Sequence, residues 1–321
     1  MKPSNHKLTS SLATGFHKGL NGFFWVLKIL VPISLLTAVL AWSGWLNRLD
    51  FILIPIMKLI GLPPVAVLPL IAGLLTGPYG AIAAMAPLPL TIEQMTLLAV
   101  FLLISHNLIQ EGVIQANSGL SFLPATLFRL LASVITVMML SLVLGMETAD
   151  HAKDIATAGY REPFLTMLKS WTVETLVLSL KIMVIIVPIM IGLEMLKNYR
   201  LIDRAVELLA PLLRIMGLRK ETGFLWLTAV VFGLTYGAAV IVEEVRQGNL
   251  GREELERLQI SIGINHSMIE DPALFIAIGL GFWWMVFPRL LASVCAVHLF
   301  VLFRRLSVHR LFSSIGALRK K

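Results

Sequence analysis

The chain has 321 residues, of which 57% are hydrophobic and only 14% are charged, and its formal net charge is +8. Soluble domains carry about 25% charged residues, so this composition excludes an ordinary soluble protein and predicts an all-α integral membrane protein. We expect no nucleic-acid partner, because lysines and arginines gather in the two membrane-flanking tails. The single cysteine, Cys295, excludes an internal disulfide and a multi-cysteine metal site.

The first long apolar run, residues 23–42, is long enough to cross a bilayer as a helix. It is too long for a secretory signal and has no small-residue cleavage site after it, so we interpret it as a membrane helix. The basic tails, residues 1–22 and 306–321, are typical of cytoplasmic flanks. The sequence therefore predicts a multi-pass protein of the inner (cytoplasmic) membrane, with the lipid bilayer as a partner and both termini in the cytoplasm.

Four segments of the first half recur in the same order in the second half. The segment "FRLLASV" (128–134) recurs as "PRLLASV" (288–294), and "SHNLIQEG" (105–112) recurs as "NHSMIEDP" (265–272), both at an offset of 160 residues. Two further pairs, "LIPIMKLIGL" with "LAPLLRIMGL" and "GPYGA" with "LTYGA", keep nearly the same offset. Ordered anchors at a nearly constant offset indicate an internal duplication.

The duplication predicts two membrane repeats, residues 23–145 and 171–305, joined by a polar linker at 146–170. Each repeat is expected to contain a long apolar helix, a shorter basic stretch along the interface, a helix interrupted by glycines, an element with a histidine motif, and a final "RLLASV" helix. In chain order these are 23–44, 49–60, 65–86, 94–118 and 122–145, then 172–196, 202–216, 223–245, 254–282 and 287–305.

The relative orientation of the repeats depends on the fourth element of each. If that element crosses the membrane the repeats are parallel, and if it returns as a re-entrant hairpin they are inverted. The distribution of lysine and arginine favours neither arrangement. Gly112 and Pro272 occupy equivalent positions in the middle of this element, and proline interrupts a helix. Because a broken helix at membrane depth requires protein or a watery cavity beside it, we favour inverted repeats with broken or re-entrant helices.

The stretch "GINHSMIEDPALF" places ionisable residues in the middle of an apolar segment. Its motif begins about eight residues beyond the polar run "GREELER", or roughly 12 Å along a helix into the bilayer. His266 and Glu270 are four residues apart and share a helix face. Asp271, followed by Pro272, is predicted to be the N-cap of a new half-helix that points its positive end into the protein. Transporters build midplane sites from broken helices of this kind.

The first half carries a matching polar motif before Gly112. Each polar residue taken alone could be structural, since a cap or a freed carbonyl would explain it. Together they favour a functional site, because an uncompensated charge at this depth costs several kcal/mol. The predicted substrate-binding residues are His106, Asn107, Gln110, Glu111, Asn265, His266, Glu270 and Asp271, with Tyr79 and Tyr236 added from the glycine-rich third elements. Tight helix packing explains the two tyrosines equally well.

Imidazole and carboxylate ligands suit Zn, Mn or Fe(II). The predicted metal ligands are His106, Glu111, His266, Glu270 and Asp271. The same set could instead hold a nucleoside through its amides and one acid, or relay protons. No resident cofactor is identified, and a divalent metal is expected as substrate or ligand. Two arginines that open the last helices, Arg129 and Arg289, could pair with Glu111 or with Glu270 and Asp271, but they are expected to snorkel to the membrane interface.

The "LTYGA" helix followed by "GINHSMIEDPALF", with a related pair in the first half, resembles the nucleoside-recognition or Gate membrane proteins. That family includes gate segments of ferrous-iron permeases, parts of concentrative nucleoside transporters, and spore-maturation membrane proteins. The resemblance covers residues 25–305 and does not specify a substrate. This sequence contains no G-x-x-x-x-G-K-[ST] phosphate loop, and Cys295 lies outside the motif, so it departs from iron permeases in two respects.

The resulting hypothesis is a Gate-type membrane transporter that moves a small polar or ionic solute, either a divalent metal cation or a nucleoside, through a midplane site at the repeat interface. The alternative is a non-transporting scaffold or assembly factor resembling the spore-maturation proteins. An enzyme is not expected, because neither H-E-x-x-H nor G-x-S-x-G occurs. The solute, the coupling ion and the oligomeric state, including a homo-oligomer, do not follow from the sequence.

Overall fold

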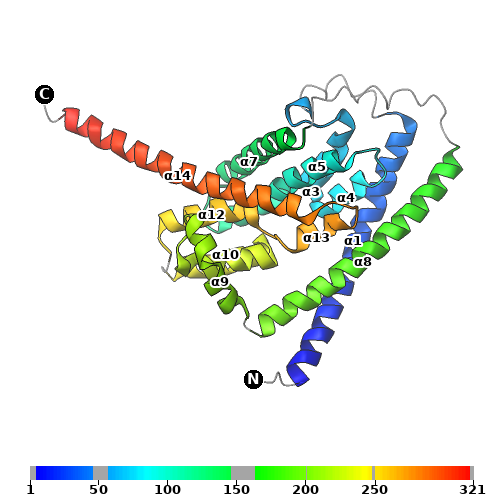
Figure 1. The fold of residues 1–321 in the computed structure, drawn as a ribbon, viewed down its shortest axis with the longest axis horizontal. Helices are drawn as coiled ribbons and strands as arrows, with labels where there is room; N and C mark the ends of the chain where they lie inside the picture. Colours follow the sequence, from blue (N-terminus) through cyan, green and yellow to red (C-terminus); the bar gives the residue numbers. More distant parts are fainter. Residues whose placement is uncertain (1–4, 46–56, 146–162, 200, 248–249, 319–321) are drawn as a thin grey trace.

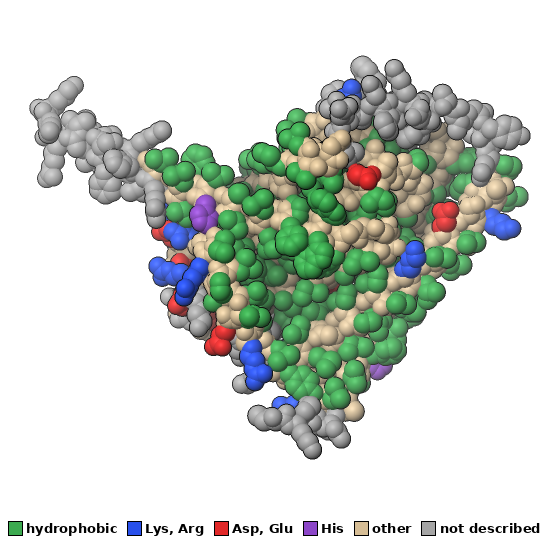
Figure 2. Space-filling view, viewed as in Figure 1, with side chains coloured by type: hydrophobic (Ala, Val, Ile, Leu, Met, Phe, Trp, Pro, Cys, Tyr) green, Lys and Arg blue, Asp and Glu red, His purple; other side chains and the backbone are tan. Residues whose placement is uncertain are grey.

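The computed structural model describes residues 5–45, 57–145, 163–199, 201–247 and 250–318, and all regular structure within these ranges is helical (Figure 1). Within these described ranges, five helical segments are long and apolar enough to cross a membrane: Lys7–Ser43, Ile92–Asn117, Phe122–Val143, Phe164–Asn198 and Phe282–Arg304. The predicted all-α membrane architecture is therefore confirmed. Hydrophobic side chains cover most of the face shown in Figure 2, and charged side chains lie toward its edges.

The two longest apolar helices outside the centre form a crossed pair (Figure 1). They are α1 (Asn5–Ser43) and α8 (Phe164–Asn198), and both begin well before the residues predicted from the sequence. A Cβ placed on Gly15 would lie 2.5 Å from the Cα of Ile191, so only glycine permits the helices to come this close. An ion pair of 2.6 Å between Lys18 and Glu194 joins them near the same point.

Two pairs of short helices, one in each half, fold back on themselves. They are α3 (Val67–Thr76) with α4 (Pro78–Met85), and α10 (Gly223–Phe232) with α11 (Leu234–Arg246). Eight residues along a continuous helix span about 12 Å. A Cβ on Gly73 would nevertheless lie 3.0 Å from the Cβ of Ala81, and one on Gly237 would lie 2.5 Å from the Cβ of Ala229. Each pair is therefore a helical hairpin, where the sequence predicted one interrupted helix.

The hairpins turn at equivalent glycines. Gly77 has φ 84° and Gly233 has φ 86°, a backbone conformation that side chains with a Cβ rarely adopt. The first turn lies against the break of the next element, since the backbone N–H of Asn107 donates to Gly73 O at 3.3 Å. The second turn is held in the same way, because Ser267 N–H donates to Ala229 O at 3.2 Å. The hairpins thus fix the position of the polar motifs.

The fourth element of each half is a broken helix. Its parts are α5 (Ile92–Ser105) and α6 (Leu108–Asn117) in the first half, and α12 (Arg252–Asn265) and α13 (Glu270–Ile276) in the second. The predicted breakers were wrong: Gly112 lies inside α6, and the chain breaks earlier, directly after His106 and His266. Asn107 (φ 47°) and Ser267 (φ 49°) make the break by adopting the left-handed conformation.

Asp271 does not cap the second half-helix. The N-cap residue is Ile269, and Asp271 lies in the first turn of α13. An acidic residue still favours the positive end of a helix in this position. The half-helix itself is present, and it carries Asp271 toward the centre of the molecule.

The remaining described elements complete each half in the same order. They are η2 (Pro64–Ala66) and α7 (Phe122–Val143) in the first half, and α9 (Leu201–Ile215), η5 (Lys220–Thr222) and α14 (Phe282–Leu318) in the second. Most of the first predicted interfacial stretch, at 49–56, and most of the linker, at 146–162, lie outside the described residues. The inverted relation of the halves remains a prediction.

The hydrophobic core surrounds the two broken helices. Residues 97–104 of α5 are all buried, and α5 contacts α3, α4, α7, α12 and α14. The α12 helix contacts α5, α7, α10 and α14 in turn. Because α5 and α12 lie side by side at the centre, the polar residues at their ends meet inside the protein.

Candidate functional site

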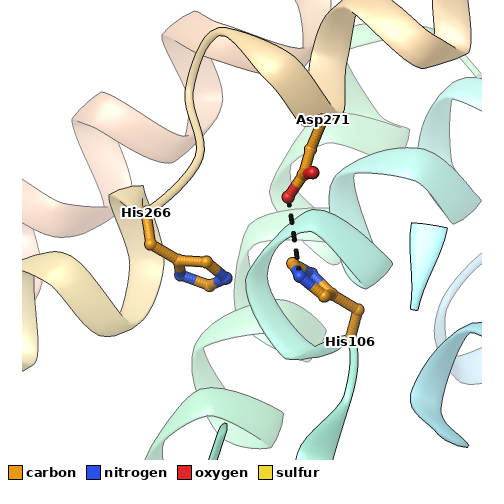
Figure 3. Close-up of side chains that lie close together, drawn as sticks. All are labelled: His106, His266 and Asp271. Carbon is orange, nitrogen blue, oxygen red and sulfur yellow. Dashed lines mark ion pairs between the residues drawn. The ribbon is translucent and has the colours of Figure 1, made fainter. Parts of the chain in front are cut away.

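Two histidines meet where the broken helices end. His106 is the C-cap of α5 and His266 is the C-cap of α12, and both side chains are buried. Their ring centroids are 4.9 Å apart. Figure 3 shows the two rings approaching from opposite halves of the chain, with Asp271 of α13 above His106. The structure therefore brings together motifs that are 160 residues apart in the sequence.

Hydrogen bonds set the same tautomer in both rings. Nδ1 of His106 lies 2.9 Å from Leu102 O, and Nδ1 of His266 lies 3.0 Å from Ile262 O. A carbonyl oxygen can only accept, so Nδ1 is the donor and a neutral ring presents a lone pair on Nε2. This pattern, a histidine held by a backbone carbonyl through one nitrogen, is typical of metal-ligating histidines.

Two carboxylates face the Nε2 atoms. Glu111 of α6 places Oε1 3.0 Å from His106 Nε2 and Oε2 3.2 Å from His266 Nε2. Asp271 Oδ2 lies 3.5 Å from His106 Nε2. Lone pairs on neutral imidazoles repel carboxylate oxygens at such distances, so a proton or a cation between them would stabilise the arrangement.

Three of these side chains have the separation of a potential metal site. Ligand atoms of His106, His266 and Asp271 all lie within 4.8 Å of one another. Two tetrahedral ligands about 2.1 Å from one ion are about 3.4 Å apart, so the widest pair would need to close by up to about 1.4 Å for the three to share it. Glu111 also ion-pairs with Arg129, which leaves it less free to serve as a ligand.

The expectation that the two arginines snorkel to the membrane interface was wrong. Arg129 and Arg289 are completely buried. Arg129 donates from Nε to Ile104 O at 2.9 Å and from Nη2 to His106 O at 2.9 Å. The carbonyls at the end of a broken helix have no intrahelical partner, and a guanidinium fork satisfies two of them at once. Burial is therefore favoured over snorkelling.

Arg289 repeats this arrangement in the second half. Its Nε donates to Ile264 O at 2.9 Å and its Nη2 to His266 O at 2.6 Å. Both arginines thus hold the backbone of a site histidine. The recurrence of arginine in both "RLLASV" segments was the signal that could have assigned them to the site.

Residues 23–146 match the Gate family, described as nucleoside recognition. The predicted resemblance to the Gate family is confirmed. The chain is also 27% identical over 288 residues to the "Uncharacterized membrane protein YvoD" of Bacillus subtilis (strain 168), covering 89% of this chain and 91% of that protein. No solved structure matches.

The Gate match contains one half of the site. His106, Glu111 and Arg129 lie within it, whereas His266 and Asp271 come from the second half. The family and the membrane relative support a multi-pass membrane protein with transporter-like character. The site described here is built by the Gate-matching half together with the rest of the chain.

Two more predicted residues, Tyr79 and Glu270, form a contact between the two halves. Tyr79 of α4 donates its hydroxyl to Glu270 Oε1 at 3.0 Å, so a hairpin of one half contacts α13 of the other. The ring of Tyr79 packs edge-on against Trp25. Glu270 is thereby turned toward Tyr79, and it is not one of the three residues that could share an ion.

The other predicted residues have different environments. Asn265 is completely buried, and neither polar atom of its side chain makes a hydrogen bond with the described residues. Asn107 packs against the hairpin turn, since a Cβ on Gly77 would lie 2.7 Å from its Nδ2. Gln110 is exposed and lies outside the cluster. The side chain of Tyr236 is outside the described part of the structure.

A second buried polar group escaped the sequence analysis. Gln259 of α12 donates from Nε2 to Ser118 Oγ at 2.7 Å, and Gln115 of α6 donates to Gln259 O at 3.4 Å. These residues join the two halves about two helical turns from the histidines, since Gln259 lies seven residues before His266. Their positions do not correspond under the repeat, so no sequence pattern indicated them.

Proposed function

We propose that this protein is a membrane transporter that carries a divalent metal cation through the buried site formed by His106, His266 and Asp271. The observation that supports this most is the pair of histidines whose Nδ1 atoms are both held by backbone carbonyls, so that both Nε2 atoms face each other and two carboxylates. Imidazole nitrogen and carboxylate oxygen form a good ligand set for Zn, Mn or Fe(II).

The proposed transporter consists of two inverted repeats, residues 23–145 and 171–305, in the inner membrane with both termini in the cytoplasm. The site lies at their interface, where the first repeat contributes His106, with Glu111 beside it, and the second contributes His266 and Asp271. A transport site must open to each side in turn, and two repeats that move relative to one another can provide this. The hydrogen bond between Tyr79 and Glu270 joins the repeats, so it would break and re-form during such a motion.

Protons would compete with the cation. Each neutral Nε2 can bind either a metal ion or a proton, and the same holds for the carboxylates. Metal binding would therefore release protons and weaken as the pH falls. This competition couples cation movement to a proton gradient without any further residue.

A nucleoside is the second candidate for the solute. The completely buried and unpaired amide of Asn265 is the observation that favours it, because an amide can donate to and accept from the edge of a base. The family description, nucleoside recognition, points the same way. A neutral nucleoside would not need to displace protons from the histidines.

Thermal unfolding of the purified protein tests the proposal. Wild type is titrated with Mn²⁺, Zn²⁺ and, separately, with nucleosides, and a ligand at 100 times its Kd should stabilise the protein by about 2.7 kcal/mol. The double variant His106→Ala/His266→Ala should lose the response to the metal. His298→Ala is the matched control, because His298 makes the same Nδ1 bond to a carbonyl but is exposed on α14.

Three outcomes contradict the metal site. Stabilisation by a nucleoside and not by metals assigns the solute to the second candidate. An undiminished metal response in the double variant places the metal elsewhere. No response to either ligand favours a membrane scaffold without a transport site.

A further inference from the structure

The two buried arginines hold equivalent carbonyls, but they differ in their carboxylate partners. Arg129 forms an ion pair with Glu111. Glu111 and Asp271 occupy equivalent positions in the repeated motif, 160 residues apart, yet no ion pair joins Arg289 to Asp271 in the described structure. The first half therefore contains a formed ion pair, Arg129 with Glu111. In the second half the equivalent residues, Arg289 and Asp271, are separated.

The separated members are both incompletely satisfied. Arg289 uses Nε and Nη2 on the carbonyls of Ile264 and His266, and its Nη1 is buried without a hydrogen-bond partner. Asp271 Oδ2 is also buried, accepts no hydrogen bond from the described residues, and lies 3.5 Å from His106 Nε2. Asp271 is one methylene shorter than the glutamate at the equivalent position, and in the conformation seen it lies against His106 and not against the guanidinium.

The two groups both lie beside His266. Arg289 holds the carbonyl of His266, and the ring of His266 offers a nitrogen within 4.8 Å of an Asp271 oxygen. The guanidinium is fixed by its two carbonyl bonds, so Asp271 is the member that can move. Rotation of a side chain about its first bond does not require a change of the helices.

We propose that Arg289 is the internal counter-ion of the unloaded site. When the cation leaves, Asp271 turns from the imidazoles to Nη1 of Arg289, and when a cation binds, Asp271 returns. This inference rests on the cation transport proposed above. An unpaired carboxylate inside a membrane protein is strongly disfavoured, so whenever Asp271 carries neither a cation nor a proton the empty carrier requires this counter-ion to change its orientation.

The proposal separates two transport modes. In exchange, the carrier crosses loaded in both directions, and Asp271 always faces a cation. In net uptake, the carrier returns empty, and this step requires the pair of Asp271 with Arg289. Loss of Arg289 should therefore impair net uptake much more than exchange.

Proteoliposomes and radiolabelled Mn²⁺ provide the test. Net uptake is measured with Mn²⁺-free vesicles, and exchange is measured with vesicles preloaded with unlabelled Mn²⁺. For Arg289→Gln, the ratio of net uptake to exchange should fall about tenfold or more relative to wild type. Arg304→Gln is the control: Arg304 is an arginine of the same helix, α14, but its partner is Glu256 outside the site, so the ratio should stay within about twofold.

Equal losses of both modes in Arg289→Gln would make Arg289 a purely structural residue and overturn the proposal. An unchanged ratio would do the same. If wild type neither binds nor transports Mn²⁺, the proposed function itself has failed, which is a separate result.

A second variant covers the case in which Arg289→Gln does not fold. Asp271→Glu adds the methylene that lets Glu111 reach Arg129, so the longer acid should remain paired with Arg289. The expected result is about a tenfold loss of Mn²⁺ affinity with no loss of melting temperature. Unchanged Mn²⁺ affinity in Asp271→Glu would contradict the proposed competition between Arg289 and the cation.

Discussion

Neutralising Glu111 should destabilise the protein more than any other single isosteric change at the site. Glu111 contacts His106, His266 and Arg129, and Arg129 is completely buried. In Glu111→Gln the guanidinium loses its charge partner but remains in the interior. Removing one member of a buried ion pair costs about 3–5 kcal/mol, because the remaining charge is uncompensated.

A double substitution distinguishes charge from packing. In Glu111→Gln/Arg129→Met both charges are removed, so we expect a smaller loss than in Glu111→Gln, although the carbonyls of Ile104 and His106 then lose their donors. The control is Glu256→Gln, which disrupts ion pairs with Arg252 and Arg304 at the surface. Such pairs contribute about 0–1 kcal/mol.

The measurement is the free energy of unfolding in mixed micelles for wild type and the three variants. The reasoning is refuted if Glu111→Gln is no less stable than Glu256→Gln. It is also refuted if the double variant loses as much as Glu111→Gln, since the buried charge would then not be the cause.

Four further outcomes follow from the same structure. The affinity of wild type for Mn²⁺ should fall as the pH is lowered, because protons compete for the Nε2 atoms of His106 and His266. Titration calorimetry at several pH values measures this affinity, and an affinity that does not change with pH would show that the histidines are not ligands. Tyr79→Phe should cost about 1.5–3 kcal/mol of stability through the lost bond to the Glu270 carboxylate, and an unaltered melting temperature would mean that the contact is weak. Gly77→Ala should cost about 1–3 kcal/mol, because the residue has φ 84° and the new Cβ meets Asn107, whereas Gly192→Ala, with nothing within 4 Å, should be neutral or stabilising. If the repeats are inverted, cysteines at positions 153 and 200 should be labelled from outside and inside the cell, respectively, and the opposite pattern would exclude this topology.

The pairing of the two polar motifs was predictable from the sequence because it repeats. The segments around His106 and His266 share their spacing and their depth in apolar surroundings. Charged groups at that depth avoid lipid, so their meeting inside the protein was a physical expectation. The location of the helix breaks was not predictable in the same way. The breaks were predicted at Gly112 and Pro272. They occur instead at Asn107 and Ser267, which adopt the left-handed conformation and whose backbone N–H groups bind hairpin carbonyls.

The hairpins and the arginines show where local sequence stops being informative. Residues 65–86 have the apolar character of one helix. The structure shows that the chain reverses at Gly77 and packs Gly73 against Ala81. Arginine near a helix start usually extends to the interface. In this fold the broken helices leave backbone carbonyls without partners in the interior, and Arg129 and Arg289 are the donors within reach.

The sequence by itself determined that the chain is an all-α membrane protein, that it contains a duplicated polar motif, and which histidines and carboxylates that motif contributes. Composition and periodicity carry this information because the bilayer imposes length and polarity on every segment. The tertiary structure alone decided which nitrogen of each histidine faces the site, that Glu111 is paired with Arg129 while Asp271 is not paired with Arg289, and that Glu270 is turned toward Tyr79. Those features depend on distances of a few ångströms between helices that are far apart in the chain, and no local sequence pattern encodes them.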